Sequence, residues 1–143
     1  MKIYIVILIA VFLMPFVSSA QKCVGVNYNY ELPKSDGFKK SLSQSFTIQK
    51  GESILINQTF FENNEYFISL FGNENIGKIR FRLLSKTGDK NQVLFDNANN
   101  NYKLTQNIII KNTVPLIIEI SAPNHDSIHN ECLGIQIHFN RNL

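Results

Sequence analysis

The sequence lacks most of the motifs by which enzymes and cofactor-binding proteins are recognised. It has no Cys-x-x-Cys pair, no Gly-x-Ser-x-Gly nucleophile elbow and no glycine-rich loop that could hold a phosphate. It has no tryptophan, the strongest platform for stacking a sugar, which weakens a carbohydrate-binding function. These absences argue against redox, serine-hydrolase and nucleotide chemistry and favour a protein that is not an enzyme and needs no cofactor.

Charge is also scarce. Charged residues make up 17% of the 143 residues, and 14 Lys and Arg face 11 Asp and Glu. A formal net charge of +3 is too small to indicate a nucleic-acid partner. The 44% of hydrophobic residues excludes a disordered chain, and the length corresponds to a single domain.

The first twenty residues have the pattern of a secretory signal peptide. Lys2 supplies a positive start, an apolar run of about fifteen residues follows, and Ser18 to Ala20 form a small-residue cleavage site. The run is short for a membrane span, and no later segment is long and apolar enough to be one. We therefore expect residues 1–20 to be removed after Ala20 and residues 21–143 to form the exported domain. A lipid anchor on Cys23 is the less favoured alternative.

Cleavage leaves a chain with two cysteines, Cys23 and Cys132, near its two ends. An oxidising compartment permits a disulfide, and two cysteines allow only one intrachain pair. We predict that they form a structural crosslink between the start of the domain and its last strand. Two free thiols are the alternative.

Beyond the signal peptide the apolar residues recur with period two, as in β-strands. In residues 78–83, Ile79, Phe81 and Leu83 share one face, and Lys78, Arg80 and Arg82 share the other. Residues 66–71 and 114–120 are apolar on both faces and are predicted to be central strands. The pattern predicts strands at 24–30, 42–49, 53–60, 65–71, 78–85, 92–96, 102–110, 114–121 and 132–139. Turn signals about every ten residues indicate an all-β sandwich of eight to nine strands.

The order of these landmarks is similar to that of a known group of proteins. After Cys23 come Phe46 to Glu52, Tyr66 to Leu70, Val93 to Asn97 and Cys132 to Ile137. This order resembles small secreted proteins of Bacteroidetes-type bacteria, and more loosely the pre-peptidase C-terminal and CUB-like domains. The resemblance implies a single β-sandwich of jelly-roll type. It implies no catalytic residue.

Two loops contain residue types that bind metal ions. His125, Asp126 and His129 lie close together, but Pro123 and Asn124 indicate a loop without the support that a metal site needs. Asp96 and Asn97 begin an Asn-rich segment that offers oxygen ligands for calcium but only one carboxylate. Plain polar loops are the favoured interpretation of both.

Two sets of side chains are candidates for a binding surface. Lys78, Arg80 and Arg82 form an ordered basic row, and Tyr28 and Tyr30 form a possible stacking surface. Glu119, in an apolar strand, is expected to face outward toward an Arg or Lys across the sheet.

The sequence therefore predicts an exported, non-catalytic binding module of the cell envelope or exterior. Its partner would be an envelope protein or a glycan and not a nucleic acid. The alternatives are a carbohydrate- or calcium-dependent adhesion domain, and a small secreted hydrolase whose site assembles only in the fold.

Overall fold

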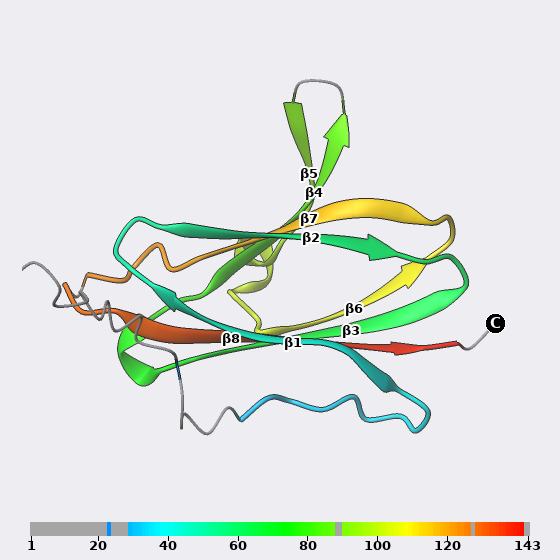
Figure 1. Cartoon of the computed structure of the whole chain (residues 1–143), viewed down its shortest axis with the longest axis horizontal. Helices are drawn as coiled ribbons and strands as arrows, with labels where there is room; N and C mark the ends of the chain where they lie inside the picture. Colours follow the sequence, from blue (N-terminus) through cyan, green and yellow to red (C-terminus); the bar gives the residue numbers. More distant parts are fainter. Residues whose placement is uncertain (1–22, 24–28, 88–89, 127, 142–143) are drawn as a thin grey trace, which may run out of the picture.

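The computed structural model describes residues 23, 29–87, 90–126 and 128–141 (Figure 1). The predicted signal peptide lies outside these residues. The described part is all-β, as predicted, and contains eight strands and two short 3-10 helices. They are β1 (Lys39–Ile48), β2 (Ser53–Phe60), β3 (Asn64–Gly72), η1 (Glu74–Ile76), β4 (Arg80–Thr87), β5 (Lys90–Asp96), η2 (Asn97–Asn100), β6 (Thr105–Ile110), β7 (Val114–Ser121) and β8 (Glu131–Asn140). None of the helices in this part is long and apolar enough to cross a membrane.

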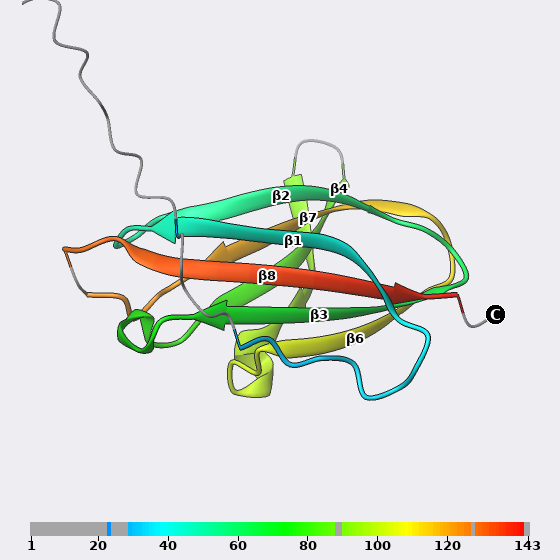
Figure 2. The ribbon, with the colours of Figure 1, turned by 60° about the horizontal axis from the view of Figure 1, so that its bottom comes forward.

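The strands form two four-stranded antiparallel sheets that face each other (Figures 1 and 2). Sheet A has the order β1-β8-β3-β6, and sheet B has the order β2-β7-β4-β5. Apart from the β4–β5 hairpin, each strand is followed by one in the other sheet. This is the arrangement of a jelly roll, which confirms the predicted fold class.

The core lies between the two sheets and follows the predicted alternation. Phe81 and Leu83 of β4 point into it, together with Ile79 just before the strand. From the facing sheet, Ile135 and Ile137 of β8 are completely buried against them. Each such side chain stabilises the fold by about 1.5–3 kcal/mol, so the inward rows hold the sheets together.

Most predicted strands are present with small changes at their ends. The strand predicted at 102–110 begins only at Thr105, because Asn101 and Tyr102 have left-handed backbone conformations with φ of 52° and 57°. Residues 24–28 of the first predicted strand lie outside the described part. Its last two residues, Asn29 and Tyr30, are not in a strand, so that part of the prediction is wrong.

The two segments predicted to be central strands are central. They form β3 and β7, which lie inside sheets A and B. The outward face of β3 is covered by residues 29–38, which we call the arm (Figure 2). Tyr30 contacts the edge of Phe71 at a ring distance of 6.2 Å, and Phe38 contacts Phe67 at 6.5 Å. The arm explains why both faces of this strand are apolar.

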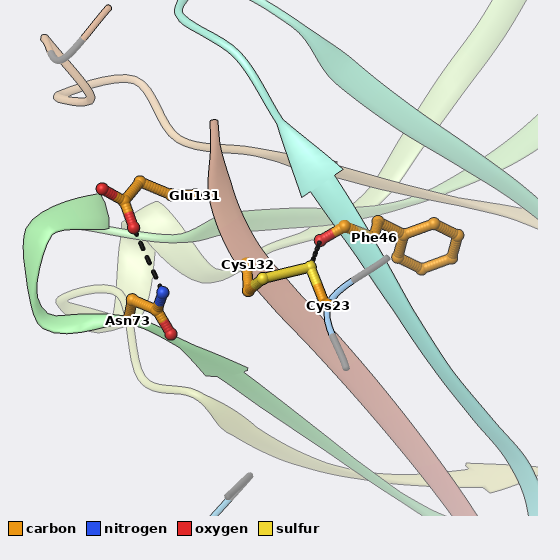
Figure 3. Close-up of a disulfide and its surroundings, with 5 residues drawn as sticks. All are labelled: Cys23, Phe46, Asn73, Glu131 and Cys132. Carbon is orange, nitrogen blue, oxygen red and sulfur yellow. Dashed lines mark hydrogen bonds between the residues drawn. A yellow bond between two sulfur atoms is a disulfide. The ribbon is translucent and has the colours of Figure 1, made fainter. Parts of the chain in front are cut away.

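A disulfide joins Cys23 to Cys132, as predicted (Figure 3). The two Cα atoms are 5.7 Å apart, within the range that a disulfide spans. Cys132 is the second residue of β8, so the bond ties the start of the domain to its last strand. The sulfur of Cys23 also lies 3.1 Å from the carbonyl oxygen of Phe46 on β1. Both sulfur atoms are used in this bond, so neither cysteine is a free thiol.

The disulfide closes a long loop, since 109 positions separate its two cysteines. Replacing both residues, in Cys23→Ser/Cys132→Ser, should lower the free energy of unfolding by about 2–5 kcal/mol. Urea denaturation followed by circular dichroism measures this loss. Reduction of the unchanged protein should give a similar loss. Detection of two reactive thiols in the native, oxidised protein would contradict the bond.

Candidate functional site

The basic row does not form an open cationic patch. Arg80 and Arg82 lie on the outward face of β4, but each is paired with an acid. The Nε of Arg80 is 3.1 Å from both carboxylate oxygens of Asp96, and Arg82 forms an ion pair with Glu119 of β7. Lys78 precedes the strand, and its Nζ lies 4.9 Å from the centre of the Tyr102 ring. Each of these three residues therefore has a partner within the domain, and their role as a binding surface stays a prediction.

The ion pairs make this part of sheet B electrically balanced. The hydrogen bond from Arg80 is the main reason that the pKa of Asp96 is lowered, although partial burial acts in the opposite direction. Glu119 faces outward toward Arg82, its partner in the β4–β7 register, as predicted. The charges of these two pairs, Arg80 with Asp96 and Arg82 with Glu119, compensate each other. Little net charge is left there for an external ligand.

Asp96 and Asn97, the candidate calcium ligands, have structural partners. Asp96 also accepts a hydrogen bond from the backbone of Ala98, which caps η2. The Asn97 side chain is completely buried. Its Oδ1 accepts from the backbone of Phe81 at 2.8 Å, and its Nδ2 donates to the carbonyl oxygens of Ile79 and Lys103. The two residues thus fix the β5–β6 connection to the start of β4.

The histidine loop is also held by internal contacts. The ring of His125 is buried, and its Nε2 is 3.2 Å from the carbonyl oxygen of His129. Asp126 is paired with Lys50, which lowers the pKa of its carboxyl. Within the described ranges, no three His, Cys, Asp or Glu side chains come close enough to hold a metal ion.

Tyr30, a candidate for sugar stacking, and the other described tyrosines have contacts within the domain. Tyr30 packs against Phe71, Tyr66 is buried in the core, and Lys78 covers Tyr102. Tyr28 lies outside the described residues. The remaining histidine, His138, lies on the outward face of β8 between Lys40 of β1 and Phe67 of β3. It is only 8% exposed, and its Nδ1 has no hydrogen-bond partner in the part of the chain that the structure describes.

An apolar row crosses the outward face of sheet B beside the ion pairs. Ile117 of β7 lies opposite Leu84 of β4, which in turn lies opposite Val93 of β5. Leu84 is buried although it does not belong to the core between the sheets. At β5 the row is open, because Val93 is 47% exposed and its neighbour Leu94 is 52% exposed.

The β4–β5 hairpin projects from the sandwich (Figure 1). β4 pairs with β7 only as far as Leu84, so beyond that residue the hairpin strands pair only with each other. The register shifts at Leu83 and Leu84, and such a bulge bends a strand pair. A groove of about 350 Å³ lies beside the hairpin. It is lined by β7 at Pro115 and Ile117, by the hairpin at Ser85 and Lys86, and by β2 at Asn57 and Thr59.

Sequence reasoning placed none of these groove residues in a functional site. In the sequence, Asn57 and Thr59 alternate with core residues, as the outward residues of any strand do. Lys86 belongs to a segment with the composition of a turn. How far the hairpin projects depends on where the pairing between β4 and β7 stops. A sequence pattern within one strand does not show where its pairing with another strand ends.

Comparisons with known proteins give little further information. No family model and no curated protein matches the sequence. Among solved structures, the chain is similar to PliG of Aeromonas hydrophila, a periplasmic inhibitor of g-type lysozyme, with a TM-score of 0.48 and 10% sequence identity. The match covers 77% of this chain and 92% of that one. A likeness at this level carries no conclusion about the function of this chain.

The role assigned to Asn97 is testable by its removal. Asn97→Ala leaves the buried N–H of Phe81, the buried carbonyl of Ile79 and the partly buried carbonyl of Lys103 without their partner and should cost about 2 kcal/mol or more of stability. The control is Asn99→Ala in the same segment, η2. Because Asn99 is exposed, this variant should be nearly neutral. Thermal and urea denaturation measure both variants. A calcium-dependent midpoint in the unchanged protein would contradict the structural role.

His138 predicts a dependence of stability on pH. Burial, and to a smaller extent Lys40, lower the pKa of its ring below the ordinary 6.5, so the fold favours the neutral ring. The resulting stabilisation is complete above the unfolded pKa and is lost as the pH falls below it. Unfolding by urea at about pH 7.5 and about pH 5 should show this loss, and His138→Gln should reduce it. The exposed His129 is the control, since His129→Gln should leave the loss in place. An equal loss in His138→Gln would contradict this assignment.

Proposed function

We propose that this chain is an exported, non-catalytic binding module that contacts a protein partner through the projecting hairpin and the outward face of sheet B. The observation that carries this proposal is the open end of the apolar row, where Val93 and Leu94 are exposed on the hairpin. Exposed apolar side chains that form a group, rather than scattered ones, are typical of interaction sites.

The shape of the hairpin supports the same function. A two-stranded hairpin is only marginally stable in water, and this one continues past its last contact with the sheet. It stands beside a groove lined by apolar residues of β7 and by polar residues of β2 and the hairpin, a mixture that protein-binding surfaces often have. The hairpin and the groove together offer a projecting and a recessed surface to one partner.

Export is part of the proposal and has two supports. The first twenty residues have the pattern of a secretory signal peptide, and the domain contains a disulfide, which persists in oxidising compartments. From the resemblance to small secreted proteins of Bacteroidetes-type bacteria, we also propose that the chain comes from such a bacterium. That origin is consistent with export.

The other functions considered have weaker support. A calcium-dependent function would need Asp96, whose carboxylate already binds Arg80 and the backbone of Ala98. Sugar stacking would need an open aromatic ring, whereas the described tyrosines are packed or covered. A hydrolase would need convergent titratable groups in a pocket, and the acids on the outward face of sheet B are paired with arginines.

Capture from an envelope extract of the source organism tests the proposal. The unchanged domain should retain one consistent protein, and Val93→Lys/Leu94→Lys should retain at least about tenfold less of it, because charges enter the apolar contact. Ile109→Lys is the matched control. Ile109 is 64% exposed on β6 of the opposite sheet, so this variant should behave like the unchanged domain.

Retention of the same protein by all three forms would contradict the assignment to the hairpin. Failure to retain any protein would contradict the binding function itself. Circular dichroism of each form shows whether the exposed substitutions leave the fold intact.

A further inference from the structure

A second cavity opens at the side of the sandwich where β1 and β2 lie. It has a volume of about 210 Å³. An apolar cavity of about 150 Å³ accommodates benzene, so this one has room for a six-membered ring with a short substituent. Three aromatic side chains line it, those of Phe61, Tyr66 and Phe139. Tyr66 and Phe139 are held in the core or against it, whereas Phe61 is 57% exposed.

The turn between β2 and β3 forms one wall of this cavity. Asn63 has a left-handed backbone with φ of 57°, which asparagine tolerates better than most residues. Asn64 follows and is only 6% exposed. Its Nδ2 donates to the carbonyl oxygens of Phe61 and Glu62 at 3.3 and 3.2 Å.

Those two contacts fix the orientation of the Asn64 amide. Since both partners are carbonyl oxygens, the nitrogen of the amide faces them. Asn64 Oδ1 is buried, with no hydrogen-bond partner among the described residues, and a ligand in the cavity cannot reach it. Asn64 therefore holds the turn that carries Phe61 and supplies no open acceptor to the cavity.

The cavity also has a cation and lacks an anion. Arg141 follows β8 and lines the cavity, and no carboxylate lines it. Among the described residues, Arg141 has no ion pair. Its guanidinium group is suited to a planar carboxylate, which it can bind with two hydrogen bonds.

We propose that this cavity binds an aromatic group that carries a carboxylate, either a free N-acylated aromatic amino acid or the C-terminal aromatic residue of a polypeptide. The aromatic ring lies among Phe61, Tyr66 and Phe139, and the carboxylate pairs with Arg141. A ring and a negative charge are the two features that the cavity complements. The site does not involve the projecting hairpin, and it does not depend on the function proposed above.

Calorimetry with N-acetylphenylalanine and its neutral amide tests the charge pairing. The unchanged domain should bind the acid at least about fivefold more tightly than the amide, and Arg141→Gln should remove that difference. Phe61→Ala should weaken both probes by a similar factor, because it removes part of the ring's surroundings. Both residues are exposed, so neither substitution should affect folding.

Two matched controls accompany these variants. Lys111→Gln removes an exposed cation on the β6–β7 turn, and Ile109→Ala removes an exposed apolar side chain on β6; both should bind like the unchanged domain. The inference is overturned if the acid does not bind at millimolar concentration, if acid and amide bind equally, or if Arg141→Gln retains the preference.

A peptide of uncharged residues ending in phenylalanine distinguishes the two sources. Tighter binding of this peptide than of N-acetylphenylalanine supports the C-terminus of a polypeptide as the ligand. Equal binding supports the free acylated amino acid.

Discussion

The burial of one face of every strand between the two sheets is the constraint on which the rest of this structure depends. The jelly-roll order sends the chain back and forth between the sheets, so each strand must contribute an apolar row to the same core. Phe60, Phe81, Ile118 and Ile135 are completely buried there. Because apolar side chains fill the described core, the polar groups that could bind a ligand lie on the outward faces, in the turns and at the open sides.

The two outward faces are completed in different ways. On sheet A, the arm covers β3 through the contacts of Tyr30 with Phe71 and of Phe38 with Phe67, and it continues into β1. On sheet B no segment of the described chain covers the face, and charged side chains instead satisfy one another. A face completed by ion pairs stays accessible, which is why the proposed protein contact lies on sheet B.

The sequence was sufficient to predict the fold, because a period of two is a local signal. Ile79, Phe81 and Leu83 point inward and Arg80 and Arg82 outward, as the alternation requires. The disulfide followed from counting, since two cysteines allow one pair. Pairing of the outward charges was predictable only for Glu119. The partner of Arg80 is Asp96, sixteen positions away on β5, and an alternation pattern within one strand does not report which acid comes beside it.

The sites themselves depend on distances that no pattern contains. Asn64 and Arg141 are 77 positions apart in the sequence and line one cavity because β3 begins where its antiparallel neighbour β8 ends. Asp96 and Asn97 show the reverse case, in which suitable ligand types turned out to hold the backbone. A polar residue acquires its role from the partners that the fold gives it.

The end of β2 connects the two proposed binding surfaces. Gln58 and Thr59 line both the groove beside the hairpin and the aromatic cavity. Successive residues of a strand point to opposite faces, so a short stretch of β2 contributes to a surface on sheet B and to an opening between the sheets. The two surfaces therefore adjoin at Gln58 and Thr59, and a single polypeptide that reached from one to the other would cross the end of β2.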